Sequence, residues 1–231
     1  MPTANAWAPG PLHPLFTDDA VHVWRADLAA VSPELEELLC DDERARAERF
    51  LSAPDGERWR RSRGLLRTLL GRYLQLEPRS LRFATGEYGK PALLPPPDHP
   101  APASPGGVFF NLSHSDGLAL YAFSQAGAVG IDVEVASRPI DAVAVAARMF
   151  GSAEAKRLKE LDPAIRQREF LRAWVRYEAR LKCLGVGIGA SPAATVSSEL
   201  WVAEIELNPP AAAAVAAEHP AGGPRCWDWQ Q

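Results

Sequence analysis

Cysteines, excess basic charge and long apolar runs are all scarce in this sequence, and each scarcity excludes a class of protein. The three cysteines, Cys40, Cys183 and Cys226, lie far apart without a CxxC pair, which argues against a disulfide framework or a zinc site and fits a reducing cytosol. The 231 residues carry a formal net charge of −4, which gives no overall case for nucleic-acid binding. No apolar run approaches the roughly 20 residues of a membrane helix, and the first 16 residues lack the regions of a signal peptide. We therefore expect a soluble cytoplasmic protein, a monomer, that binds neither nucleic acid nor membrane.

Proline is abundant but concentrated in one segment. Residues 91–107 contain seven prolines in 17 positions, so neither a helix nor a central strand can run through them. We interpret this segment as an exposed connection between two halves, 1–107 and 108–231; the alternative is a long loop inside one domain. Strand patterns followed by helix patterns occur in both halves and suggest a duplicated α+β unit.

Apolar spacing and capping residues predict the elements. The expected helices cover about 33–50, 55–75, 141–150, 152–161 and 163–184, the first with Ser32 as its N-cap and the last stopped by GVGIG. The expected strands cover 21–28, 81–83, 108–111, 118–124 and 129–135, with further strands within 194–207.

Two carboxylates, Asp132 and Glu134, stand in the expected strand VGIDVEV. Residues i and i+2 of a strand point to the same face, so these side chains lie next to each other. Carboxylate oxygens suit Mg²⁺, which takes one or two protein carboxylates together with substrate phosphates. The spacing by itself favours the alternative slightly: an edge strand with a solvated acidic face.

The expected helix at 163–184 carries Trp174, Glu178 and Lys182 at i, i+4 and i+8, which places them on one face. A glutamate and a lysine at this spacing commonly form only a surface pair. The tryptophan on the same face weakens that interpretation, because a solvated face has little use for an indole.

The segment NLSHS (111–115) follows the expected strand GVFF and offers small polar side chains and a histidine. In a loop after a strand these groups could contact a phosphate or act in acid–base chemistry. A turn held together by asparagine and serine hydrogen bonds explains the pattern equally well.

Arginine is concentrated between Arg44 and Arg72, where nine arginines face three acidic residues. Arg60, Arg63 and Arg67 fall on one helical stripe. Clustered arginine in an otherwise acidic protein indicates a phosphate-binding surface, and a solvated helix face is the alternative.

Taken in order, these motifs resemble the Sfp-type (surfactin-synthetase-activating) 4′-phosphopantetheinyl transferases. The matching segments are RSRGLLRTLLGRYL, EYGKP, FNLSHS, VGIDVE, RMF and WVRYEARLKCLG, and they span residues 44–189. The resemblance implies an α+β fold of two similar lobes in a pseudo-twofold arrangement, with the active site in the cleft between them. It also implies the activity: transfer of 4′-phosphopantetheine from coenzyme A to a serine of an apo acyl or peptidyl carrier protein, with Mg²⁺, giving the holo-carrier and 3′,5′-ADP.

The resemblance assigns roles residue by residue. Mg²⁺ would be bound by Asp132, Glu134 and Glu178, with Glu178 also the base for the carrier serine. Lys182 would contact the pyrophosphate, Ser113 and His114 the coenzyme A phosphates, and Lys90 and Arg63 the nucleotide end, assisted by Arg46 and Arg49. The catalytic group would comprise Glu178, Lys182 and His114.

One departure from the family pattern stands beside the expected base. Tyr177 occupies the position where the family usually has a lysine, in W-x-x-K-E-A-x-x-K. This departure motivates the alternative of a weak or inactive relative that binds coenzyme A or a carrier protein as a regulator. A magnesium-dependent phosphoesterase, or a nucleic-acid binder using the arginine helix, is the remaining and least favoured alternative.

Overall fold

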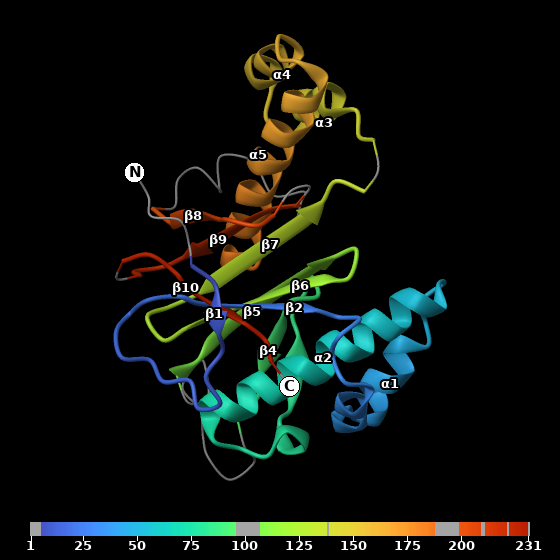
Figure 1. Cartoon of the computed structure of the whole chain (residues 1–231), viewed down its shortest axis with the longest axis vertical. Helices are drawn as coiled ribbons and strands as arrows, with labels where there is room; N and C mark the ends of the chain where they lie inside the picture. Colours follow the sequence, from blue (N-terminus) through green and yellow to red (C-terminus); the bar gives the residue numbers. More distant parts are fainter. Residues whose placement is uncertain are drawn as a thin grey trace.

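Two sheets and two long helices form the body of the protein. The computed structural model describes residues 6–95, 107–137, 139–187, 199–208, 211–220 and 222–230. Within these residues, helix α2, a five-stranded sheet, a three-stranded sheet and helix α5 follow one another as layers (Figure 1). The predicted α+β class is confirmed.

The elements lie mostly where apolar spacing predicts them. The α-helices are α1 (Asp41–Ala47), α2 (Ala53–Leu74), α3 (Ala142–Met149), α4 (Ser152–Lys159) and α5 (Pro163–Leu184), and the 3₁₀ helices are η1 (Pro33–Leu38) and η2 (Pro78–Ser80). The strands are β1 (Ala8–Pro9), β2 (His22–Asp27), β3 (Phe83–Thr85), β4 (Pro91–Leu93), β5 (Phe109–Ser115), β6 (Leu118–Ser124), β7 (Val129–Val135), β8 (Trp201–Ile205), β9 (Ala211–Ala217) and β10 (Arg225–Asp228).

The larger sheet has the strand order β1-β10-β2-β6-β5, with β10 parallel to its neighbours and β6 antiparallel to both of its own. The smaller sheet, β7-β9-β8, is antiparallel throughout, and β3 and β4 form a separate hairpin. The larger sheet takes strands from both sides of residue 107. The division into lobes 1–107 and 108–231, and a pseudo-twofold relation between them, stay predictions.

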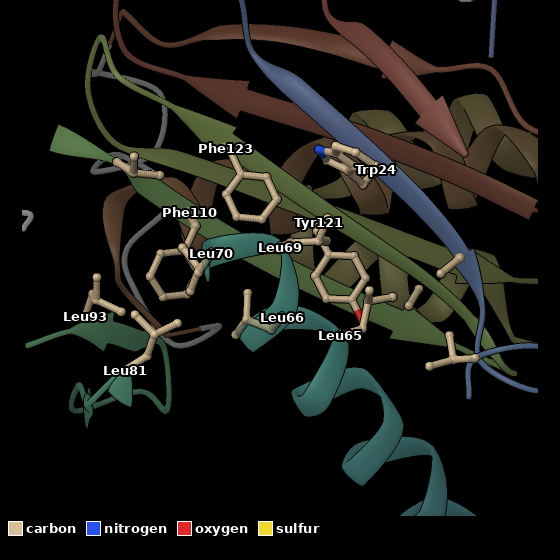
Figure 2. Close-up of a cluster of buried hydrophobic side chains, with 14 of the residues drawn as sticks. Trp24, Leu65, Leu66, Leu69, Leu70, Leu81, Leu93, Phe110, Tyr121 and Phe123 are labelled. Carbon is tan, nitrogen blue, oxygen red and sulfur yellow. The ribbon is translucent and has the colours of Figure 1, made fainter. Parts of the chain in front are cut away.

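Alternation along β2 and β6 builds a core on each face of the larger sheet. Trp24 and Tyr121 point toward α2, while Val23 and Leu120 point toward the smaller sheet. On the α2 side the helix contributes four fully buried leucines, Leu65, Leu66, Leu69 and Leu70, drawn in Figure 2. Because both faces of the larger sheet are covered, β2 and β6 are buried almost throughout.

Helix α5 lies against β7, and the two backbones approach most closely at Gly130. A Cβ atom at this position would lie 2.2 Å from both the Ala179 carbonyl oxygen and the Cys183 nitrogen. Only glycine allows this approach. It brings the helix face that carries Glu178 and Lys182 next to the carboxylates of β7.

The helix expected over 33–50 is wrong as a single helix. Ser32 does cap a helical turn, accepting a hydrogen bond from the Glu34 amide, but that turn is η1. Leu39 is extended, and a new helix, α1, starts after Cys40. The Glu43 carboxylate accepts a hydrogen bond from the Cys40 amide at 3.0 Å, so a capping box favours the restart over continuation.

Two further expectations need correction. The segment 111–115 is part of strand β5, paired with β6 along its whole length, and not a loop after a shorter strand. The proline-rich segment begins with strand β4, which pairs with β3, so its first residues are not a free connection. Its residues 96–106, and residues 194–198 of the last expected strand region, lie outside the described part of the chain.

Candidate active site

Strands β5 and β7 belong to different sheets, and side chains from β5 join them. Ser113 donates to Asp132 Oδ1 at 2.9 Å, and Ser115 donates to Glu134 Oε2 at 3.0 Å. Two residues before Ser113, the Asn111 side chain accepts a hydrogen bond from the Ile131 amide at 2.9 Å. The i, i+2 spacing of a strand therefore sets three polar side chains of β5 against the acidic segment of β7.

Asp132 lies at the centre of this contact and is almost fully buried. Its Oδ1 accepts a hydrogen bond from Lys182 Nζ at 2.6 Å, and Lys182 also donates to Ser113 Oγ at 3.0 Å. Asp132 Oδ2 is buried without a hydrogen-bond partner. Serine, aspartate and lysine from β5, β7 and α5 thus form one polar triad with an unused carboxylate oxygen.

Glu178 and Glu134 complete the acidic cluster. Burial, and next the negative charge of Asp132, raise the pKa of both carboxyl groups above their usual range. Glu178 Oε1 is buried without a hydrogen-bond partner. As they stand, no three His, Cys, Asp or Glu side chains in the described ranges form a group that could hold a metal ion. The three-carboxylate magnesium site stays a prediction.

Helix α5 holds this face against the smaller sheet because apolar residues lie beside the charged ones on the same broad face of the helix. Leu171, Val175 and Ala179 are buried, as the helical spacing predicts. Tyr177, next to Glu178, packs edge-on against Phe150 with ring centroids 5.5 Å apart. Trp174 is expected on the same helix face as Glu178 and Lys182. Its ring belongs to this aromatic group, with its centroid 6.4 Å from that of Tyr177. The position of the family lysine is thus taken by an aromatic side chain in an aromatic environment.

A cleft of about 360 Å³ brings together most of the cationic and hydroxyl groups predicted from sequence. Predicted residues that line it are Arg46, Arg63, Lys90, Ser113, His114 and Lys182. Arg49 lines a neighbouring cavity that shares Arg46 with the cleft. Asp132, Glu134 and Glu178 do not line the cleft themselves; Asp132 reaches its edge through Ser113 and Lys182.

The arginine stripe is mostly engaged in ion pairs within the protein. Arg63 Nε and Arg67 Nε donate to the two oxygens of Glu43 at 2.5 and 2.8 Å, and Arg60 Nε donates to Glu36 at 2.6 Å. Arg67 is fully buried, which makes it a structural residue. Arg63 retains a face on the cleft, and burial, opposed by Glu43, lowers its pKa.

Lys90 and His114, both predicted to contact coenzyme A, differ in how they stand toward the cleft. Lys90 donates to three main-chain carbonyl oxygens at the end of α5 and in β7. His114 is accessible from the cleft, and its pKa is lowered by the surrounding protein and then by Lys182 and Arg58. The neutral imidazole is therefore the form that the cleft favours.

The sequence did not single out several residues that shape the site. Trp59 and Tyr88 line the cleft, and the Arg46 guanidinium lies over the Trp59 ring, 5.5 Å from the ring centroid. Nothing in their spacing distinguishes these aromatic residues from core residues. Asn111 and Ser115 could have been found, because they share the strand face of Ser113.

Comparisons with known proteins identify the family. The family model of the 4′-phosphopantetheinyl transferase superfamily matches residues 128–230. The 4′-phosphopantetheinyl transferase HetI of Nostoc is 37% identical over 80% of this chain and 76% of its own. The transferase Sfp of Bacillus subtilis is 30% identical over 65% of this chain and 62% of its own, and a putative transferase of Synechocystis is 33% identical over 68% and 61%. No helix within the described ranges is long and apolar enough to cross a membrane. With the motifs, the fold and these relatives in agreement, the chain belongs to the 4′-phosphopantetheinyl transferase superfamily.

Proposed function

We propose that this protein transfers 4′-phosphopantetheine from coenzyme A to a serine of an apo acyl or peptidyl carrier protein and releases 3′,5′-ADP. The observation that carries the proposal is the triad of Ser113, Asp132 and Lys182 at the edge of an arginine-lined cleft. Cations and hydroxyl donors lie on the cleft side of this triad and buried carboxylates lie behind it. A phosphorylated substrate fits the cleft, and a cation fits between its phosphates and the carboxylates.

Coenzyme A is the substrate that suits the cleft. Its phosphates would be bound by Arg46 and Arg63, with Arg49 at the neighbouring cavity, because guanidinium groups pair well with phosphate oxygens. Neutral His114 would donate to a further phosphate oxygen, and Ser113 would do so by exchanging its hydrogen bond to Asp132 for one to the phosphate. Lys182 would stabilise the charge that develops on the pyrophosphate during transfer.

The acidic cluster fits a divalent cation by its donor chemistry. Asp132 Oδ2 and Glu178 Oε1 are buried oxygens without partners, which is costly unless a cation or proton satisfies them. Mg²⁺ needs only one or two protein carboxylates when phosphates complete its shell, so Asp132, Glu178 and Glu134 would suffice without forming a closed cage. When bound, Mg²⁺ would supply charge stabilisation at the phosphoryl oxygens.

Glu178 is the proposed base. Its raised pKa makes the ionised carboxylate a better proton acceptor than an exposed glutamate. The serine oxygen of the carrier forms a bond to the β-phosphorus, and the bond from that phosphorus to the oxygen of the 3′,5′-ADP leaving group breaks. The serine proton passes to Glu178, directly or through a water molecule.

The test combines activity with a matched pair of variants. Wild-type protein, Mg²⁺ and coenzyme A are incubated with several apo-carriers, and the carriers are weighed intact. We expect a phosphopantetheine adduct with wild type and a loss of at least about 100-fold in rate for Glu178→Gln. Glu169→Gln, on the exposed side of the same helix, is the control and keeps its rate.

Two results would count against the proposal. No adduct on any carrier would refute the transfer activity and leave the alternative of a binding protein, which calorimetry with coenzyme A would detect. Full activity in Glu178→Gln would refute the assigned base while leaving the transfer reaction in place.

A further inference from the structure

The turn of the β3–β4 hairpin lines the cleft, and Lys90 is its last residue before β4. The turn is closed by hydrogen bonds from the Gly86 amide to the Lys90 carbonyl oxygen and from the Gly89 amide to the Gly86 carbonyl oxygen, both 2.9 Å. From this tight turn the Lys90 side chain extends away from the hairpin to β7 of the smaller sheet and to the end of α5.

The Lys90 ammonium is fully used there. Nζ donates to the carbonyl oxygens of Lys182 at 2.6 Å, Val129 at 3.1 Å and Cys183 at 3.3 Å. An ammonium has three N–H donors, so no donor remains for another ligand. Two of the acceptors belong to the last turn of α5, whose carbonyl oxygens have no partners within the helix. Lys90 therefore caps the C-terminus of α5, where a positive charge is also favourable.

A second contact fixes the same hairpin to the same helix end. A Cβ atom at Gly187, just beyond the left-handed cap residue Gly185, would lie 2.6 Å from the Tyr88 ring. The Tyr88 ring thus packs directly on the backbone that follows α5. Burial lowers the pKa of Lys90, as expected for an ammonium enclosed by protein.

We propose that Lys90 is a positioning residue: it holds the last turn of α5, and with it the Lys182 ammonium, against Asp132 and Ser113, and it does not bind the nucleotide phosphate. Testing this role by transfer rates rests on the proposed function, whereas the contact between the hairpin and the helix can be tested without it. To contact a phosphate, Lys90 would have to give up its hydrogen bonds to carbonyl oxygens that receive none from the helix itself, which leaves them without a donor. Arg46 and Arg63 remain on the cleft to bind that phosphate.

Two pairs of measurements separate positioning from phosphate binding. Rates of transfer from coenzyme A and from 3′-dephospho-coenzyme A are compared for wild type, Lys90→Met, Lys90→Arg and the phosphate-contact variant Arg46→Met. Hydrogen exchange is followed in the same proteins for peptides spanning residues 181–187.

A positioning role predicts a kcat that falls about 10- to 100-fold in Lys90→Met with little change in KM, since a small misplacement of a catalytic group has this effect. The loss is the same for both substrates, and exchange at 181–187 speeds up. Lys90→Arg, whose planar fork does not match three converging carbonyl oxygens, also loses kcat. Arg46→Met reduces the preference for coenzyme A over the dephospho form and leaves the exchange unchanged.

The proposal is overturned if Lys90→Met reduces that preference as much as Arg46→Met does, or if Lys90→Arg retains wild-type kcat and exchange. Lys90→Arg keeps the test decisive even if Lys90→Met does not fold. If wild type modifies no carrier, the proposed function fails, but the exchange comparison still decides whether Lys90 holds the end of α5.

Discussion

Glu43 offers the most quantitative test of how this fold is held together. Its buried carboxylate accepts hydrogen bonds from Arg63 Nε, Arg67 Nε and the Cys40 amide at 2.5, 2.8 and 3.0 Å. These contacts tie the start of α1 to two turns of α2 and hold Arg63 at the cleft. Replacing Glu43 by glutamine keeps the shape and one acceptor oxygen but removes the charge.

The expected loss of stability follows from what Glu43→Gln leaves behind. Arg67 still donates to the carbonyl oxygens of Pro78 and Leu81, so it is not stranded, but a buried guanidinium loses its counter-charge. Removing one partner of a buried pair costs about 3–5 kcal/mol, and the retained acceptor places this variant near about 3 kcal/mol. Glu37→Gln, at an exposed pair 3.6 Å from Arg79, is the control and changes stability by less than about 0.5 kcal/mol.

Urea denaturation followed by tryptophan fluorescence gives the free energy of unfolding. The pH dependence provides a second readout. Burial alone would raise the pKa of Glu43, but Arg67 and Arg63 bring it below its ordinary value of 4.5. Its contribution is therefore complete above about pH 4.5 and is lost as pH falls through the lower folded-state pKa. Glu43→Gln lacks this acid-dependent part; a variant that is as stable as the Glu37→Gln control would refute the reasoning.

Two further predictions concern a buried histidine and a buried glycine. Burial lowers the pKa of His22 from 6.5 to about 4, so the unfolded chain binds a proton first, and stability falls by about 3 kcal/mol as pH drops from 6.5 to 4. His22→Gln flattens this pH dependence and His13→Gln does not; equal slopes for the two variants would contradict the assignment. Gly130→Ala places a Cβ 2.2 Å from the Ala179 carbonyl oxygen and should destabilise by more than about 3 kcal/mol, whereas Gly223→Ala, with open space around it, is neutral in thermal denaturation. A neutral Gly130→Ala would show that α5 does not need this close approach.

Local chemistry was sufficient to predict most elements. Helix α5 begins at Pro163 after its Asp162 cap and ends before Gly185 because these signals act within a few residues. Strand β7 is readable from its alternation. The break at Leu39 was not predicted, since Glu43 stabilises the restart partly through Arg63 and Arg67, which lie about 20 residues further along the chain.

The candidate site divides in the same way. The spacing of Asp132 and Glu134, and of Glu178 and Lys182, follows from the geometry of one strand and one helix, so the sequence by itself determined which side chains share a face. It could not distinguish a solvated acidic face from a buried one. Only the packing of β5 and α5 against β7 decides that Asp132 is buried with Lys182 and Ser113.

The arginines and Lys90 show the limit most clearly. Sequence and resemblance determined the family, the acidic cluster and the cationic character of the cleft. The tertiary structure alone decided which cations face the cleft and which are used inside the protein, as Arg67 and Lys90 are. The reason is physical: a charged side chain binds whichever acceptor the fold brings within about 3 Å, and residues distant in sequence supply that acceptor.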